Sequence, residues 1–486
     1  MKTGKEYLAG LNDGRAVFVG SERIQNVAEH PAFRNAARTV ADIYDMKAAP
    51  ENRDSLTFEA DGQRHSAYYL QARSRGDLEK RMVAHKRIAD MTFGMFGRSP
   101  DYFASFVTGM SLAPEIFGPY SENLKSYFRF MRDRDVYAAH AVVPPQSSRD
   151  PAFYQRETKN TQACRVISES DDGLVVSGMK MLATAAILAD EIWIGNLVPL
   201  APENLPEAVT FAVPCSTPGL SLWSRKPLEP QAKNEFDSPL SWRFDETDSV
   251  VILDKVKVPW ERVFVHNSPA LAREIYIKTP AHVYGNHQSG VRFLSKLRFI
   301  LGLASRITIS TGCNELPGIR ETLGKLAAME AALQGMIFGE IHACEEWPGG
   351  YASFNRRIVY AAMNWCSDQY SGLIDCLREL SGGGVLQMPA DVSVFSSPEL
   401  RDSFQHNWAS PQMSAIDRMK LFRLVWEMVG SEFAGRQLQY EKFYAGASFI
   451  RRGHSYREAP WAEFHEVVDA LLRSYEPDPE NSRIES

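Results

Sequence analysis

A stretch of short β-type runs lies between two long helical stretches, and this order limits the folds open to the chain. Residues 137–266 hold runs such as LVVSGMKML, AVTFAVP and SVVILDKVKV, bounded by Asp, Gly and Pro, which is typical of strands joined by turns. Residues 1–136 and 267–486 instead repeat apolar residues every three or four positions, as amphipathic helices do. We predict an α+β fold with an N-terminal helical domain over 1–136, a central β-barrel domain over 137–266 and a C-terminal helical bundle over 267–486.

Two helices of the C-terminal bundle can be outlined from their side-chain spacing. Leu326, Leu333 and Ile337 fall on one face of a predicted helix. Ser414, followed three residues later by Asp417, is typical of a helix start. The polar, proline-interrupted end of the chain, YEPDPENSRIES, is expected to fray.

Composition excludes several classes of protein. The 60 acidic and 54 basic residues give a net charge of -6, and no dense Lys/Arg stripe suggests nucleic-acid binding. The six cysteines have no zinc-type spacing, so we predict no metal site and expect buried thiols in a reducing compartment. No apolar run reaches the roughly 18 residues of a membrane span, and no signal peptide is seen. We therefore expect a soluble, cytoplasmic protein.

Glycine-rich nucleotide motifs are absent from the sequence. No G-x-G-x-x-G follows a predicted strand, and no P-loop occurs. The one dense glycine stretch, SGGGV at 381–385, is open to two interpretations. Its backbone N–H groups could approach a pyrophosphate, or the glycines could simply end a helix.

The segment GRSPDYFAS at 97–105 predicts a helix start with Arg98 and Tyr102 beside it. Ser99 is a typical N-cap, Pro100 fits the first helical position and Asp101 is an acid in the first turn. A cation and a phenol at the positive end of a helix dipole favour a bound anion. From spacing alone, the commoner arrangement is an arginine that only neutralises Asp101 at a solvated cap.

His140 and Thr184 are weaker candidates when read alone. His140 lies at the step from helical to β-type sequence, where a structural histidine is commoner than a catalytic one. Thr184 ends a predicted strand, where threonine is often present for its strand propensity. Residue patterns by themselves therefore stop short of a function.

Two stretches resemble motifs of the acyl-CoA dehydrogenase fold, which is also helical, β and helical in order. They run from Gly178 to Asp190 and over DKVKVPWERV at 254–263. In that fold the threonine of the first motif hydrogen-bonds near the flavin N5, which the resemblance assigns to Thr184. This resemblance agrees with the fold predicted from the residue pattern.

A closer resemblance, to the 4-hydroxyphenylacetate 3-hydroxylase family, spans nearly the whole chain. Its signatures include HPAFRNAAR, GRSPDY, PLSWRFDETDSVVILDKVKVPWERVFV and KLFRLVWEMVGSEFAGRQLQYEKFYAG. The family comprises oxygenase components of two-component flavin monooxygenases. The resemblance implies that Arg98, Tyr102 and His140 hold the phenolic oxygen of the substrate.

The resemblance also implies a cofactor site, with one departure from the family pattern. The loop carrying Gln146, Ser148 and Arg149 matches a flavin-binding stretch, but it reads PPQSSR where relatives have N-P-Q-x-D-R. FAD would arrive already reduced (FADH2) from a separate flavin reductase and react with molecular oxygen to give a C4a-hydroperoxide. This species would hydroxylate a phenol ortho to its hydroxyl. Homotetramers are usual in this fold.

Two alternatives remain open from the sequence. One is an acyl-CoA dehydrogenase-like or dehydratase-like flavoenzyme acting on a CoA thioester. The dehydratase branch needs cysteines for an iron–sulfur cluster, and a pair expected near 98–102 is replaced here by RSPDY. The other alternative is a scaffold that kept the fold and lost activity.

Overall fold

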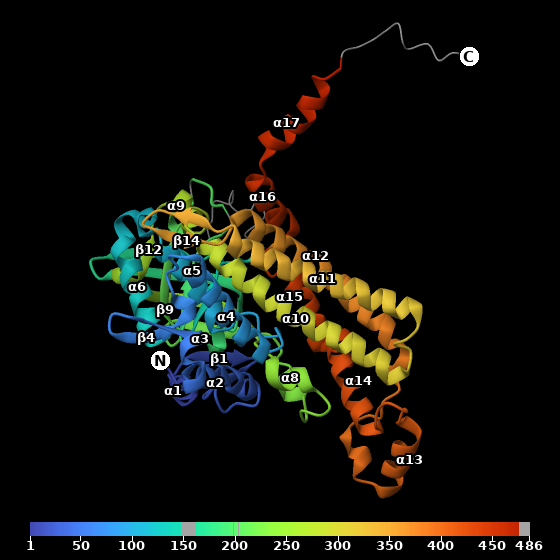
Figure 1. The fold of residues 1–486 in the computed structure, drawn as a ribbon. Helices are drawn as coiled ribbons and strands as arrows, with labels where there is room; N and C mark the ends of the chain where they lie inside the picture. Colours follow the sequence, from blue (N-terminus) through green and yellow to red (C-terminus); the bar gives the residue numbers. More distant parts are fainter. Residues whose placement is uncertain (147–161, 198, 203, 476–486) are drawn as a thin grey trace.

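Helices form the first part of the chain, as the residue pattern predicts (Figure 1). The computed structural model describes residues 1–146, 162–197, 199–202 and 204–475. The helices of the first part are α1 (Gly4–Gly10), α2 (Arg34–Ala48), α3 (Arg53–Leu56), α4 (Arg75–Met91), α5 (Pro100–Ser111) and α6 (Ser121–Arg134). A small hairpin between α3 and α4 joins β3 (Thr57–Ala60) and β4 (Gln63–Ser66).

The central part of the chain contributes to two sheets. The larger has the order β2-β1-β10-β11-β7-β6, and the smaller has the order β12-β9-β8-β5. The strands of the larger sheet are, in that order, Glu22–Ile24, Ala16–Val19, Leu220–Ser224, Asp248–Pro259, Gly173–Thr184 and Arg165–Ser170. Those of the smaller sheet are Val263–Val265, Thr210–Pro214, Glu191–Ile194 and Ala138–Ala141. No closed barrel is found among the described strands, so the predicted β-barrel is not confirmed.

Two strands of the larger sheet come from the segment expected to be helical. β1 pairs with β10 in parallel, and β2 pairs with β1 in an antiparallel hairpin. These strands are only four and three residues long, too short to show a clear alternation of apolar and polar residues. A tight turn at Asp171 and Asp172 joins β6 to β7, since Ser170 pairs with Gly173.

The last part of the chain is a bundle built around the long helix α10. The helices after the β segment are α9 (Pro269–Ile277), α10 (Ala281–Thr311), α11 (Pro317–His342), α12 (Arg356–Ser381), α13 (Pro398–Trp408), α14 (Ala415–Val429), α15 (Glu432–Phe443), α16 (Ser448–Glu458) and α17 (Trp461–Leu472). A further short helix, α8 (Pro239–Phe244), lies within the central segment, and β13 (Glu345–Trp347) and β14 (Tyr351–Ser353) form a hairpin. Helix α10 packs against α4, α5, α11 and α12 and so joins the two helical parts.

The local predictions for the bundle are confirmed. Leu326, Leu333 and Ile337 are buried on α11, and the side chain of Ser414 accepts a hydrogen bond from the Asp417 N–H at the start of α14. The glycine stretch forms a 3₁₀ turn over Gly382–Leu386, directly after α12. None of the described helices has the length and apolar character needed to cross a membrane. The described residues also include no group of three or more His, Cys, Asp or Glu side chains suited to a metal ion.

Candidate substrate and cofactor site

The start of α5 is buried in the middle of the molecule. Helix α5 begins at Pro100, directly after Ser99. Asp101 is fully buried, and its carboxylate accepts a hydrogen bond from the Ser99 hydroxyl and lies 2.7 Å from Nδ1 of His85. No salt bridge in the described residues joins Arg98 to Asp101. The expected solvated cap, in which Arg98 neutralises Asp101, is therefore not formed, because Asp101 is buried and contacts Ser99 and His85 instead.

Arg98 lies between two tyrosine rings. Its guanidinium carbon is 3.9 Å from the ring centre of Tyr102 and 3.9 Å from that of Tyr444. Nη2 donates to the backbone oxygen of Tyr444 at 2.9 Å, whereas Nη1 is buried with no hydrogen-bond partner among the described residues. Burial acts to lower the pKa of Arg98, but the surrounding tyrosines raise it above its usual value. The site therefore holds a permanent cation, and within the described part of the chain one of its nitrogens is available to a ligand.

His140 lies beside this arginine on strand β5. Its ring centre is 5.0 Å from that of Phe103, 5.1 Å from that of Phe106 and 6.4 Å from that of Tyr102. Burial, followed by the positive charge of Arg98, lowers the pKa of His140 to about 3. The imidazole is therefore neutral at physiological pH. The structure thus brings Arg98, Tyr102 and His140 together in one corner.

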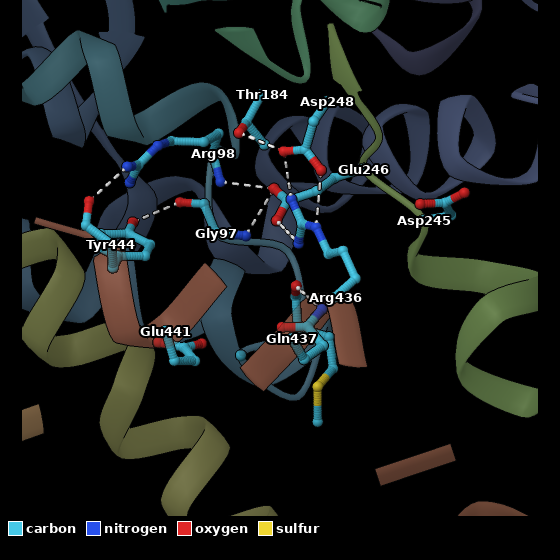
Figure 2. Close-up of polar contacts among 12 residues, drawn as sticks. Gly97, Arg98, Thr184, Asp245, Glu246, Asp248, Arg436, Gln437, Glu441 and Tyr444 are labelled. Atoms are coloured by element: carbon cyan, nitrogen blue, oxygen red, sulfur yellow. Dashed lines mark hydrogen bonds and ion pairs between the residues drawn. The ribbon is translucent and has the colours of Figure 1, made fainter. Parts of the chain in front are cut away.

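A buried carboxylate fixes the backbone in front of α5. Glu246 accepts from the N–H groups of Gly97 and Arg98 at 2.9 and 2.8 Å (Figure 2). The other carboxylate oxygen of Glu246 accepts from Nη1 of Arg436, on α15, at 2.8 Å. This contact ties the corner to a helix of the C-terminal bundle.

The same arginine connects Thr184 to the corner. Arg436 donates to Asp248 through Nε at 3.0 Å and through Nη2 at 2.8 Å. Thr184 ends β7, and its hydroxyl donates to Asp248 at 2.6 Å. Burial acts to raise the pKa of Asp248, but Arg436 and Arg225 hold it below its usual value. Because this hydroxyl proton is used, the oxygen of Thr184 presents its lone pairs to any further partner.

The other residues predicted to bind the cofactor lie at or beyond the end of the first described stretch, 1–146. Gln146 is exposed at the end of the first described stretch. Ser148 and Arg149 lie outside the described residues. Sequence reasoning also missed four side chains that surround these candidates: Tyr444 on the far side of Arg98, and Glu246, Asp248 and Arg436. All lie in segments that carry the family resemblance, but their spacing gave no separate signal because their partners are distant in the sequence.

These groups fit both ligands of a flavin-dependent hydroxylase. Nη1 of Arg98, which has no partner among the described residues, is a donor suited to an anionic oxygen, and the Tyr102 ring lies directly beside the guanidinium. The Thr184 oxygen is an acceptor suited to the N–H of a reduced flavin ring. Carboxylates that might act as a base near Thr184 are instead committed to arginines.

Comparison with known proteins defines first the fold class, from solved structures, and then the family, from family models. The fold is acyl-CoA dehydrogenase-like. A 4-hydroxybutyryl-CoA dehydratase from N. maritimus matches with a TM-score of 0.86 over 100% of this chain and 97% of that chain, and at 17% identity this likeness shows the fold alone. The chain belongs to the 4-hydroxyphenylacetate 3-hydroxylase family, whose N-terminal and C-terminal models match residues 3–265 and 272–473.

Individual relatives are similar over almost their whole length. The chain is 33% identical to the pyoverdin chromophore biosynthetic protein PvcC of Pseudomonas aeruginosa, covering 94% of both proteins. It is 32% identical to the oxygenase component of a 4-nitrophenol 2-monooxygenase from a Rhodococcus species, covering 91% of this chain and 86% of that protein. The crystal structure of an HpaB oxygenase component complexed with FAD and 4-hydroxyphenylacetate is 30% identical, with a TM-score of 0.91 over 98% of this chain and 99% of that chain.

Proposed function

We propose that this protein is the oxygenase component of a two-component monooxygenase that uses reduced FAD and molecular oxygen to hydroxylate a phenol ortho to its hydroxyl. The observation that carries the proposal is the corner at the start of α5, where a buried nitrogen of Arg98 has no partner among the described residues and lies beside Tyr102 and His140. Family membership supplies the class of reaction.

The corner performs the first task of the reaction, which is to ionise the phenol. Free phenols have a pKa near 10, so ionisation at neutral pH needs a shift of about 2–3 units, or roughly 3–4 kcal/mol. A permanent cation and hydrogen-bond donors around one oxygen act in that direction. The phenolate ring carries far more electron density than the phenol and is the better partner for an electrophilic oxygen. We therefore assign Arg98, Tyr102 and His140 to binding the substrate oxygen.

We assign Thr184, Gln146, Ser148 and Arg149 to holding the flavin. The support at Thr184 is its hydroxyl, whose proton is donated to Asp248, so that the oxygen accepts from the flavin N5 position. When bound, reduced FAD supplies the two electrons that split dioxygen between the ring hydroxyl and water. The residues of the corner orient the ring and exclude water from it.

We also propose a division into domains, a partner protein, a location and an oligomeric state. The order of the elements supports division into 1–136, 137–266 and 267–486. The absence of a nicotinamide fingerprint in the sequence supports a separate flavin reductase as partner. All six cysteines are free thiols, which supports a cytoplasmic location. Helix α17 leaves Val467 and Leu471 exposed and projects from the body in Figure 1, which supports a homotetramer in which this face is covered.

Oxygen consumption with a panel of phenols tests the proposed function. The purified protein should consume oxygen only when reduced FAD is added, and a suitable phenol should be converted to its ortho-dihydroxy product. If no phenol yields such a product while free reduced FAD is simply oxidised to hydrogen peroxide, the proposal fails. Bleaching of tightly bound oxidised flavin by an acyl-CoA would instead favour the CoA thioester alternative.

A further inference from the structure

A buried tyrosine lies within hydrogen-bonding distance of His140, and a buried tryptophan donates a hydrogen bond to that tyrosine. The Tyr276 hydroxyl lies 3.2 Å from Nε2 of His140. The indole N–H of Trp193 donates to the same hydroxyl at 2.9 Å. Tyr276 and Trp193 are both fully buried, and Trp193 lies opposite His140 in the parallel pair of β5 and β8.

The chemistry of the three side chains fixes which group donates and which accepts in the hydrogen bonds from Trp193 to Tyr276 and from Tyr276 to His140. An indole N–H can only donate, so the Tyr276 oxygen must accept from Trp193. The Tyr276 proton then has one acceptor among the described residues, which is Nε2 of His140. In the opposite arrangement, with a proton on Nε2, the Tyr276 hydroxyl proton would be buried without an acceptor, at a cost of about 1–3 kcal/mol. Burial raises the pKa of Tyr276, so its hydroxyl remains protonated.

We propose that Trp193 and Tyr276 are positioning residues that hold the His140 proton on Nδ1. Nδ1 has no hydrogen bond to a described residue, and His140 is only partly buried, so this N–H is left for a ligand. His140 then offers the corner a donor and no acceptor. A proton held on Nδ1 explains how a neutral imidazole helps the corner prefer a phenolate over a phenol, and this explanation rests on the proposed function.

The other groups near the imidazole are compatible with this assignment. The positive charges of Arg98 and Lys180 disfavour a second proton on the ring. The ammonium group of Lys180 donates to Gly195 O and Asn196 Oδ1, at 2.8 and 2.7 Å, and so does not compete for His140. The remaining titratable neighbours are Tyr102 and His282.

The ionisation of a bound coloured phenol tests the proposal directly. 4-Nitrophenol is bound to the full chain with reduced FAD under anaerobic conditions, and phenolate absorbance is recorded against pH. The wild type should ionise the bound phenol at a lower pH than in water. Tyr276→Phe should move the midpoint upward by about one pH unit, a tenfold loss of preference for the phenolate, because the His140 proton is no longer held on Nδ1, where it donates to the anion. Tyr69→Phe is the matched control, since Tyr69 is equally buried and donates to Val136 O at 2.9 Å.

Two outcomes of this titration separate the possible failures. If the wild type ionises the bound phenol as water does, the proposed function itself is wrong. If the wild type lowers the midpoint and Tyr276→Phe lowers it equally, or Tyr69→Phe moves it as far as Tyr276→Phe, the positioning role is wrong.

A second pair of variants does not depend on the folding of Tyr276→Phe. The amide nitrogen of asparagine can replace Nδ1 of a histidine, and that of glutamine can replace Nε2. His140→Asn should therefore retain more of the lowered midpoint than His140→Gln. Equal midpoints in the two variants, or the reverse order, would show that the ligand does not accept a hydrogen bond from the Nδ1 position of His140 and would overturn the proposal.

Discussion

The Arg98 guanidinium is held by aromatic rings rather than by an acidic partner. Two tyrosines sandwich the guanidinium, and the carboxylate of Glu246 contacts its backbone N–H and not its side chain. A carboxylate paired with the guanidinium would cancel the field that an anionic substrate meets. Tyrosine faces stabilise the cation and leave its net charge in place.

We expect Arg98→Lys to lower the yield of hydroxylated product by about ten- to a hundredfold, the cost of losing hydrogen bonds to a charged group. Lysine keeps the charge but loses the planar group that fits between the rings. Product and hydrogen peroxide are measured together by chromatography and a peroxide assay. Arg262→Lys is the control, because Arg262 also lies over an aromatic ring, 4.7 Å from the centre of Phe130, outside the corner. Equal product from Arg98→Lys and wild type would contradict the assignment.

The hydroxyl of Thr184 can be removed without changing the size of the side chain. Thr184→Val should release a larger fraction of the consumed oxygen as hydrogen peroxide, because the acceptor proposed to hold the flavin N5 is lost. Thr184→Ser keeps that acceptor and should behave like the wild type. The ratio of peroxide to product checks this, and identical ratios in Val and Ser variants would exclude a role for the hydroxyl.

At the scale of elements, the corner depends on close contact between α5 and α10. A side chain at Gly109 would place its Cβ 2.6 Å from the backbone of Ala281. A Cβ at Gly285 would lie 1.9 Å from the ring of Phe106, which borders His140. Glycine at these points lets the two helices approach, and the position of the aromatic ring follows from that approach.

Gly109→Ala should therefore destabilise the protein by about 1–3 kcal/mol through overpacking. Gly302→Ala is the matched control in α10, because its Cβ would meet no atom within 4 Å. That variant should be neutral or more stable by up to about 1 kcal/mol, since alanine favours the helix. Thermal unfolding compares the two, and an equal fall in both would show that the helix contact is not the cause.

The sequence predicts elements well where the signal is local. The start of α5 and the Ser414 cap follow from three or four adjacent residues, and the long strands β7 and β11 follow from extended apolar runs. The short strands β1 and β2 carried too few residues to be recognised. The Arg436 contacts were also missed, because they join residues 190 and 188 positions apart. Such pairings depend on the tertiary fold and have no local pattern.

At the scale of the whole molecule, a buried ion pair makes stability depend on pH. Glu441 on α15 accepts from Nη2 of Arg292 on α10 at 2.8 Å. Burial acts to raise the pKa of Glu441, but Arg292 and Lys296 lower it to about 2. Glu441 also acts to raise the pKa of Lys296, but burial has the larger effect and lowers that pKa to about 8. We therefore assign the stabilisation to the contact of Glu441 with both terminal nitrogens of Arg292.

Because the folded pKa of Glu441 lies below its unfolded value, its stabilisation is present above the unfolded pKa and is lost as pH falls. We expect unfolding to become easier between about pH 4.5 and pH 2. Urea titrations across this range measure the slope of stability against pH. Glu441→Gln should flatten that slope, whereas Glu432→Gln, in an exposed pair with Lys226, should not. An unchanged slope in Glu441→Gln would contradict the assignment.

Self-association is expected to depend on the exposed face of α17. Val467 and Leu471 are 74% and 66% exposed and lie four residues apart on that helix. Replacing both with glutamate should reduce the particle mass measured by light scattering, because charged groups would have to enter the covered interface. Glu466→Gln with Asp469→Asn, on the same helix, is the control. An unchanged mass in the Val467→Glu, Leu471→Glu variant would exclude this face as the contact.

The aromatic wall around Arg98 has a consequence for how the protein is made. The ribosome adds Tyr444 346 residues after Arg98. A nascent chain holding only the first two-thirds of the sequence therefore carries the guanidinium without one of the rings that enclose it. The proposed substrate corner is therefore completed only after Tyr444 has been added, and a shorter nascent chain lacks one wall of that corner.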